Sequence, residues 1–147
     1  MSRILIVYHS QSGNTKAAAE AVARGAGSIE GADVEIKQAL KATPADLLKC
    51  DGIAVGTPDY FGYMAGGLKD FFDRTYYPTQ GEVTDKPCAI FVTHGGGGKA
   101  VESVRNICRT FKFKVVAAPV VAKSRPQGED EEKLVTLGET LAQACTE

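Results

Sequence analysis

The stretch that decides the fold is Ile4-Leu5-Ile6-Val7-Tyr8-His9-Ser10-Gln11-Ser12-Gly13-Asn14-Thr15, an apolar run that ends in a polar, glycine-containing turn. A short continuous apolar run such as Ile4–Tyr8 is typical of a parallel strand covered on both faces. The alanine-rich segment Thr15–Ala26 follows with the composition of a helix. The stretch therefore predicts a strand, a tight turn and a helix, which together open a parallel α/β sheet.

The same alternation continues along the chain, with helical spacing between apolar runs. The other runs are Ile53–Val55, Ala89–Val92, Val115–Val121 and a weaker, alternating Val34–Ile36. Alternation indicates a half-exposed edge strand, whereas the continuous runs indicate covered ones. We predict an α/β, doubly wound sheet of five parallel strands in the order 2-1-3-4-5, with helices on both faces and an uninterrupted fifth strand over Val115–Val121.

Length and charge exclude several classes of protein. The chain has 147 residues, so we expect one domain over residues 1–147. Its 17 basic and 18 acidic residues leave a net charge of −1, which gives no strong attraction to nucleic acid or to acidic membranes. No apolar run approaches the roughly 20 residues of a membrane span. The start, Met1-Ser2-Arg3, lacks the features of a signal peptide, so we expect a cytoplasmic protein.

The cysteines and histidines do not indicate a metal centre. Four cysteines are scattered without a Cys-x-x-Cys pair, and only His9 and His94 could add imidazole ligands. We expect reduced, mostly buried thiols and no metal.

Three segments should hold the chemistry, because ligands of open parallel sheets bind where the strands end. The first is Ser10-Gln11-Ser12-Gly13-Asn14-Thr15, which offers three hydroxyls, two side-chain amides and a glycine at a helix N-terminus. Such a turn can surround a phosphate with N–H and O–H donors. The alternative is a simple polar turn in which Ser12 or Asn14 caps the helix.

Other phosphate motifs do not fit. A dinucleotide-binding fingerprint needs three glycines in this turn, and only Gly13 is present. Gly25-Ala26-Gly27 falls at the expected helix end, where it would act as a terminator. A P-loop would need glycine at position 93 and serine or threonine at position 100, which are Thr93 and Ala100.

The second and third segments favour a flat ring. Thr57-Pro58-Asp59-Tyr60-Phe61-Gly62-Tyr63-Met64 places three aromatic residues within four positions, which suits stacking on a heterocycle. Thr93-His94-Gly95-Gly96-Gly97-Gly98 would let backbone N–H groups approach ring oxygens. The alternatives are aromatic residues that fold onto the protein's own surface and a flexible turn. Together the three segments predict a mononucleotide with a large planar ring.

These segments resemble the flavodoxin-like FMN-binding family. Ser10–Thr15 is similar to the phosphate loop of flavodoxins, Thr/Ser-x-Thr/Ser-Gly-x-Thr. Gly56–Met64 and Leu68–Arg74 resemble the loops of the Trp-repressor-binding-protein type of NAD(P)H:quinone reductase, which reads Gly-Thr-Pro-x-x-Phe-Gly-x-Met and then x-Lys-x-Phe-x-Asp. Those reductases are longer, whereas this chain has the length of a short-chain flavodoxin, and short-chain flavodoxins are typically strongly acidic.

The resemblance implies noncovalent FMN and assigns residues to it. The expected cofactor-binding residues are Ser10, Gln11, Ser12, Gly13, Asn14, Thr15, Thr57, Pro58, Asp59, Tyr60, Phe61, Gly62, Thr93, His94, Gly95, Gly96 and Gly97. The flavin carries the chemistry, with His94 and Tyr60 as the candidate catalytic side chains. The oligomeric state stays open.

Two functions follow from the resemblance. One is an enzyme in which NAD(P)H reduces the flavin and a quinone or another acceptor takes two electrons. The other is an electron carrier that docks on redox protein partners. Pro58-Asp59-Tyr60-Phe61 has no glycine before Gly62, and a positive φ at Asp59 or Tyr60 would cost about 1–2 kcal/mol. This disfavours the backbone rearrangement that one-electron carriers use, so two-electron chemistry is the prediction.

Overall fold

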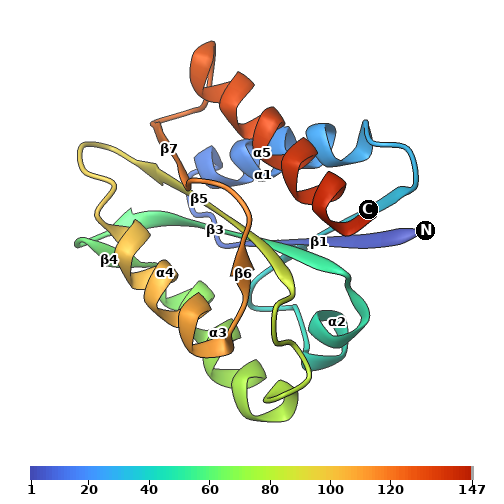
Figure 1. The fold of residues 1–147 in the computed structure, drawn as a ribbon. Helices are drawn as coiled ribbons and strands as arrows, with labels where there is room; N and C mark the ends of the chain where they lie inside the picture. The colour runs from blue at the N-terminus through green and yellow to red at the C-terminus, as the bar shows by residue number, and fades with distance from the viewer. Residues whose placement is uncertain (147) are drawn as a thin grey trace.

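The computed structural model describes residues 1–146, which form a parallel sheet between two layers of helices (Figure 1). The strands are β1 (Ser2–Tyr8), β2 (Ala32–Gln38), β3 (Gly52–Tyr60), β4 (Tyr63–Met64), β5 (Pro87–His94), β6 (Lys114–Val115) and β7 (Val120–Lys123). The helices are α1 (Asn14–Gly27), α2 (Pro44–Lys49), α3 (Gly66–Thr79), α4 (Ala100–Phe111) and α5 (Glu129–Thr146).

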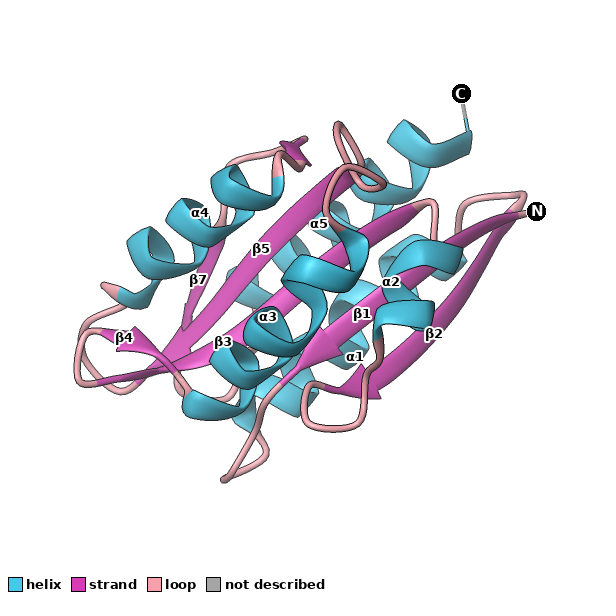
Figure 2. Cartoon of the chain, turned by 90° about the horizontal axis from the view of Figure 1, so that it is seen from below, coloured by secondary structure: helices cyan, strands magenta, loops and turns pink. Residues whose placement is uncertain are grey.

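The strand order confirms the predicted doubly wound topology. The sheet runs β2-β1-β3-β5-β6. Strand β7 also pairs with β5, farther along it than β6 does, so β6 and β7 together occupy the edge position. In Figure 2, which views the sheet from below, α2, α3 and α4 lie in front of it. Helices α1 and α5 cover the other face and pack against each other. All strands of the main path are parallel, so their carboxyl ends meet at one edge.

Each face of the sheet has its own core because side chains alternate along a strand. Ile4 and Ile6 of β1 pack with α1 and α5, whereas Leu5 and Val7 pack with α2 and α3. All four side chains are at most 2% exposed. This burial on both faces explains why the strand reads as a continuous apolar run.

The fifth strand is interrupted, so the predicted continuous strand over Val115–Val121 is wrong. Between the pairs Cys88–Val115 and Phe91–Val120, β5 advances three residues while the outer strand advances five. Two residues therefore bulge out of the ladder. Pro119 lies in this stretch and has no N–H to donate to β5.

The aromatic segment is a β-hairpin and not an open loop. Thr57–Tyr60 extends β3, and the chain returns antiparallel as β4. The two-residue turn consists of Phe61 (φ 60°) and Gly62 (φ 76°), and left-handed backbone at both positions suits the twist of a hairpin. The left-handed conformation thus falls on Phe61 and Gly62, while Asp59 and Tyr60 stay extended within β3.

The four cysteines are free thiols, and Cys50, Cys88 and Cys108 are buried. Desolvation raises the pKa of the Cys50 and Cys145 thiols to about 11, so neither is a nucleophile at neutral pH. Within residues 1–146, no helix is both long and apolar enough to cross a bilayer.

Candidate functional site

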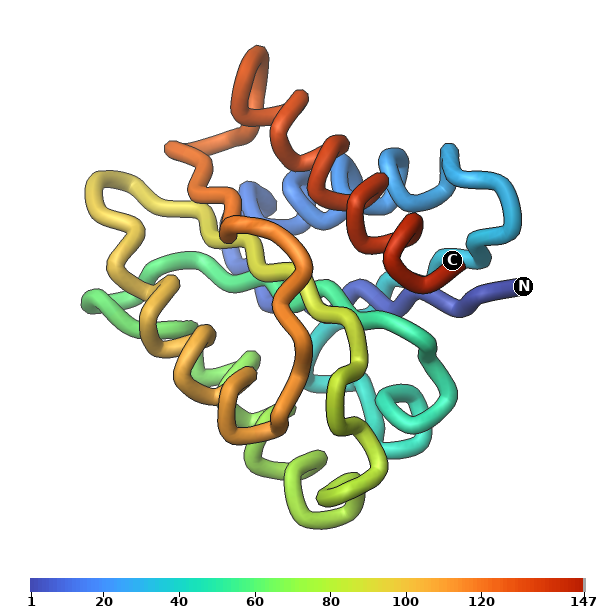
Figure 3. The backbone as a smooth tube through the Cα atoms, viewed as in Figure 1, coloured from blue at the N-terminus to red at the C-terminus, as the bar shows by residue number. Residues whose placement is uncertain are grey.

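The three predicted segments meet where the strands end, at the left of Figure 3. A cavity of about 150 Å³ lies between them. It is lined by Gln11, Ser12, Asn14, Thr15, Pro58, Asp59, Tyr60, Thr93, His94, Gly95 and Ser124. Residues from β1, β3, β5 and β7 or from the turns that follow them thus share one site, as expected at the carboxyl edge of a parallel sheet.

The first turn leaves the start of α1 without a side-chain cap. Gly13 has a φ of 97° and takes the N-cap position, and neither Ser12 nor Asn14 caps the helix. The Gly13 N–H donates to Ser10 Oγ over 3.1 Å, which folds the turn. The backbone donors of the first helical turn are therefore available to an anion, which the helix dipole also favours.

A buried hydroxyl pair joins this turn to β5. Thr15 Oγ1 and Thr93 Oγ1 lie 2.7 Å apart, and both residues are at most 3% exposed. One hydroxyl donates and the other accepts, so each satisfies the other away from water. The pair fixes the start of α1 against the end of β5, at the floor of the cavity.

Tyr60 connects the aromatic hairpin to the first turn. Its hydroxyl donates to Gln11 Oε1 over 2.9 Å, and its ring lies nearly perpendicular to that of His9, with the ring centroids 6.4 Å apart. Desolvation raises the pKa of the Tyr60 hydroxyl, which keeps it protonated as a donor. The second segment is thereby held over the first.

Asp59 and Thr57 hold the hairpin in place from within. Asp59 Oδ1 accepts from the Gly62 N–H (2.8 Å) and Oδ2 accepts from the Ala100 N–H at the start of α4 (3.0 Å). The buried Thr57 hydroxyl accepts from the Ala65 N–H and donates to the Pro58 carbonyl. Both side chains are therefore engaged with the protein's own backbone.

The glycine segment leaves an open surface beside the cavity. Gly95 and Gly96 do not have positive φ, and a Cβ added at either position would meet no atom within 4 Å. Neither backbone conformation nor internal packing therefore requires glycine at these two positions. Their missing side chains instead leave room for a flat ligand against the backbone, and this fits the isoalloxazine ring of FMN.

The structure also separates some predicted residues from the cavity. Phe61 stands fully exposed at the hairpin tip and does not line the cavity. The other predicted residues outside the lining are Ser10, Gly13, Thr57, Gly62, Gly96 and Gly97. Ser124, in contrast, lines the cavity and was missed by the sequence analysis. It directly follows β7, so the rule used for the other strand ends would have found it.

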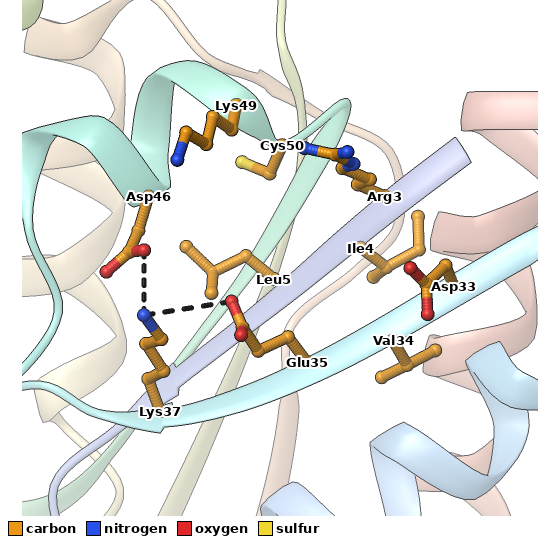
Figure 4. Close-up of a pocket in the computed structure, with 10 residues that line it drawn as sticks. All are labelled: Arg3, Ile4, Leu5, Asp33, Val34, Glu35, Lys37, Asp46, Lys49 and Cys50. Carbon is orange, nitrogen blue, oxygen red and sulfur yellow. Dashed lines mark hydrogen bonds and ion pairs between the residues drawn. The ribbon is translucent and has the colours of Figure 1, made fainter. Parts of the chain in front are cut away.

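A larger hollow of about 460 Å³ lies over the start of β1, beside β2 and α2 (Figure 4). Lys37 Nζ lies 2.8 Å from Asp46 Oδ1 and 3.8 Å from Glu35 Oε1. Desolvation opposes the ionisation of Asp46, but hydrogen bonds from Lys37 and Thr43 outweigh it and lower the pKa of that carboxyl. These three charges are engaged with one another.

Comparison with known proteins supports the same assignment. The sequence model of the NADPH-dependent FMN reductase family matches residues 32–127. A flavodoxin of Aquifex aeolicus (strain VF5) is 34% identical over 160 residues, covering 97% of this chain and 86% of the relative. This chain belongs to the flavodoxin-like FMN-binding family. An NAD(P)H dehydrogenase (quinone) of Acidithiobacillus ferrooxidans is 37% identical over 144 residues, covering 81% of this chain and 72% of the relative.

Solved structures agree with the fold. A flavodoxin from the domain Archaea superposes with a TM-score of 0.89 at 27% identity, covering 99% of both chains. A WrbA-like protein from Agrobacterium tumefaciens, described as a flavodoxin, superposes with a TM-score of 0.78 at 24% identity. This flavodoxin-like chain is therefore a redox protein with FMN as its cofactor, and the family name supports NAD(P)H as electron donor.

Proposed function

We propose that the protein is an NAD(P)H:acceptor oxidoreductase that uses two-electron chemistry, with a quinone or a similar small molecule as acceptor. When bound, FMN supplies the redox chemistry, taking a hydride from NAD(P)H and passing two electrons on. Relatives named flavodoxin and NAD(P)H dehydrogenase (quinone) support a redox protein. The choice between an enzyme and an electron carrier rests on the hairpin formed by β3 and β4.

Three groups of residues would hold the cofactor. The N–H and O–H donors of the first turn would bind the phosphate, contributed by Ser10, Ser12, Gly13, Asn14 and Thr15. The hairpin would border the ring through Pro58, Tyr60, Phe61 and Gly62. The end of β5 and the glycine segment after it would line the ring's oxygen-bearing side, through Thr93, His94, Gly95, Gly96 and Gly97; in the structure the Gly97 N–H itself donates to His94 Nδ1. Gln11, Thr57 and Asp59 would shape these loops through the hydrogen bonds described above.

The observation that carries the two-electron proposal is how firmly the hairpin backbone is held. The Asp59 carboxylate accepts one hydrogen bond from the Gly62 N–H in the turn and another from the Ala100 N–H at the start of α4. The Met64 N–H donates to Ser103 Oγ over 3.0 Å, which fixes the returning strand on α4. A rotation of the peptide between Phe61 and Gly62 would break the bond from the Gly62 N–H to Asp59, at a cost of about 0.5–1.5 kcal/mol. If the backbone cannot rearrange, the protein would not stabilise a flavin that has taken up only one electron.

An electron carrier is the second candidate, and one observation favours it. Phe61 is fully exposed and Tyr63 is 44% exposed at the hairpin tip, next to the candidate ring site. Exposed aromatic residues are common in protein interfaces. In this reading a redox protein would dock on the tip and receive electrons through the ring edge.

Steady-state oxidation of NAD(P)H by the FMN-loaded protein separates the two candidates. We expect turnover that rises with added quinone and is absent in the apoprotein. A carrier would oxidise NAD(P)H slowly with or without quinone and would need a protein reductase. The apoprotein reloaded with FMN serves as the control, because it must recover the full rate.

A further inference from the structure

His94 stands at the point where β5 passes into the glycine segment. Its backbone is held in the sheet, because its carbonyl accepts from the Ser124 N–H over 2.8 Å and it pairs in register with Lys123. Its side chain turns toward the segment that follows. The Gly97 N–H donates to His94 Nδ1 over 2.9 Å, so residues 95–97 fold back over the imidazole ring of His94.

This hydrogen bond requires a neutral imidazole. A neutral ring has one N–H and one acceptor nitrogen, and here the acceptor is Nδ1, so the proton lies on Nε2. A protonated ring carries N–H at both nitrogens. Its Nδ1–H would then face the Gly97 N–H, and two donors cannot bond to each other. Protonation therefore removes the bond or moves the loop.

Little else holds the loop in this shape. Gly95, Gly96 and Gly97 are exposed, and Cβ atoms placed on Gly95 or Gly96 would touch nothing within 4 Å. At Gly97 the nearest atom would be Asp59 Oδ2 at 3.7 Å. Gly98 lies beside Val121 and the His94 ring, because a Cβ added there would come 2.7 Å from Val121 Cγ1 and 3.4 Å from His94 Cδ2. The imidazole thus bonds to Gly97 and lies beside Gly98.

The charged groups around His94 come from three elements. Asp59 lies on β3, and its carboxylate is engaged by Gly62 and Ala100. Lys99 stands at the start of α4, and Lys123 is the register partner on β7. Among residues 1–146, none of these three side chains forms an ion pair. Within the same residues, no carboxylate forms an ion pair with the His94 imidazole.

We propose that His94 is a positioning residue for FMN: its neutral Nδ1 fixes the glycine segment so that the backbone of Gly95 and Gly96 faces the flavin ring, and its protonation releases that segment. The inference rests on the proposed placement of the ring. It predicts that FMN affinity depends on the acceptor at this position and falls when the imidazole is protonated.

Two variants separate the acceptor from the proton. His94→Asn keeps an acceptor at the δ position, since the side-chain oxygen can take the Gly97 N–H, but it does not titrate. His94→Ala removes the acceptor. At pH 8 we expect His94→Ala to bind FMN about three- to tenfold more weakly than the wild type does, because one hydrogen bond is lost. We expect the FMN affinity of His94→Asn to stay within about twofold of the wild-type affinity, because that bond is kept. Quenching of flavin fluorescence during titration of the apoprotein measures this.

The pH profile gives the second readout. Between pH 8 and pH 5.5 the affinity of the wild type should fall more than that of His94→Asn. The titration of the FMN phosphate itself is common to both proteins and cancels in the comparison. Equal pH dependence of the two proteins, or wild-type affinity in His94→Ala, would overturn the proposal.

A measurement on the apoprotein keeps the proposal independent of FMN. In nitrogen-15 spectra, the Gly97 amide of the wild type should exchange with solvent faster at pH 5.5 than the intrinsic pH dependence of exchange predicts. In His94→Asn that excess should be absent. If the Gly97 amide of the wild type is equally protected at both pH values, the proposed release of the glycine segment by protonation of His94 is wrong, even if FMN binds as proposed. If FMN does not bind the wild type at all, the site assignment fails instead.

Discussion

At the scale of single residues, the candidate site is built from side chains that bond to one another across loops. Thr15 bonds to Thr93, Tyr60 to Gln11, and Asp59 to Gly62 and Ala100. All of these bonds except the one from Gly62 join segments at least 41 residues apart in the sequence. The site is therefore pre-formed in the protein itself, which lowers the entropic cost of binding a ligand.

Thr15 offers a test of this cross-linking. Thr15→Val keeps the shape of the side chain but leaves the Thr93 hydroxyl buried without its partner. We expect it to lower the free energy of unfolding by about 1–3 kcal/mol and to weaken FMN binding. Thr15→Ser keeps the hydroxyl and should retain most of both properties. Urea unfolding of the apoprotein and FMN titration measure the two effects, and an unchanged Thr15→Val variant would refute the role of the pair.

Sequence reasoning singled out the segments that meet at the candidate site but not these bonds. The turn after the first strand and the glycines after His94 stand out by composition alone. That Asp59 binds backbone N–H groups of two elements could not be predicted, because Ala100 lies 41 residues away and the contact depends on the sheet order. Composition indicates which segments are unusual, whereas the partner of each side chain is set by the tertiary fold.

At the scale of elements, two glycines let α1 and α5 cross in close contact. A Cβ at Gly25 would overlap the Val135 carbonyl, and one at Gly138 would overlap the Val22 carbonyl. The sequence analysis interpreted Gly25–Gly27 as a helix terminator. The helix does end at Gly27, but Gly25 has the additional role of admitting the backbone of the other helix. Helical spacing cannot reveal which helix lies opposite.

Gly138→Ala tests this close approach. Because the added methyl group meets backbone and not a flexible side chain, the helices must move apart, and overpacking of this kind costs about 1–3 kcal/mol. Gly27→Ala is the matched control, since its Cβ would meet nothing within 4 Å and its φ is not positive. We expect thermal unfolding to show a lower Tm for Gly138→Ala only. Equal Tm values for the two variants would contradict the crossing geometry.

At the scale of the whole molecule, the sheet order and the main helices followed from periodicity, because apolar runs and helical spacing reflect burial directly. The bulge before β7 and the hairpin at Phe61–Gly62 did not follow from it. Both depend on how a strand pairs with its neighbour, and the hairpin lies at the carboxyl side of the sheet beside the candidate site. The firmly held hairpin is what connects the fold to the proposed two-electron chemistry.

A potentiometric titration of the FMN-loaded protein tests this connection most directly. If the hairpin backbone is fixed as described, the flavin should gain both electrons in one step, and the ratio of reduced to oxidised protein should change tenfold for every 30 mV or so. A one-electron carrier would instead show two separate transitions, each with a tenfold change per 59 mV or so. A single steep transition is the result that the account predicts, and two resolved shallow ones would contradict it.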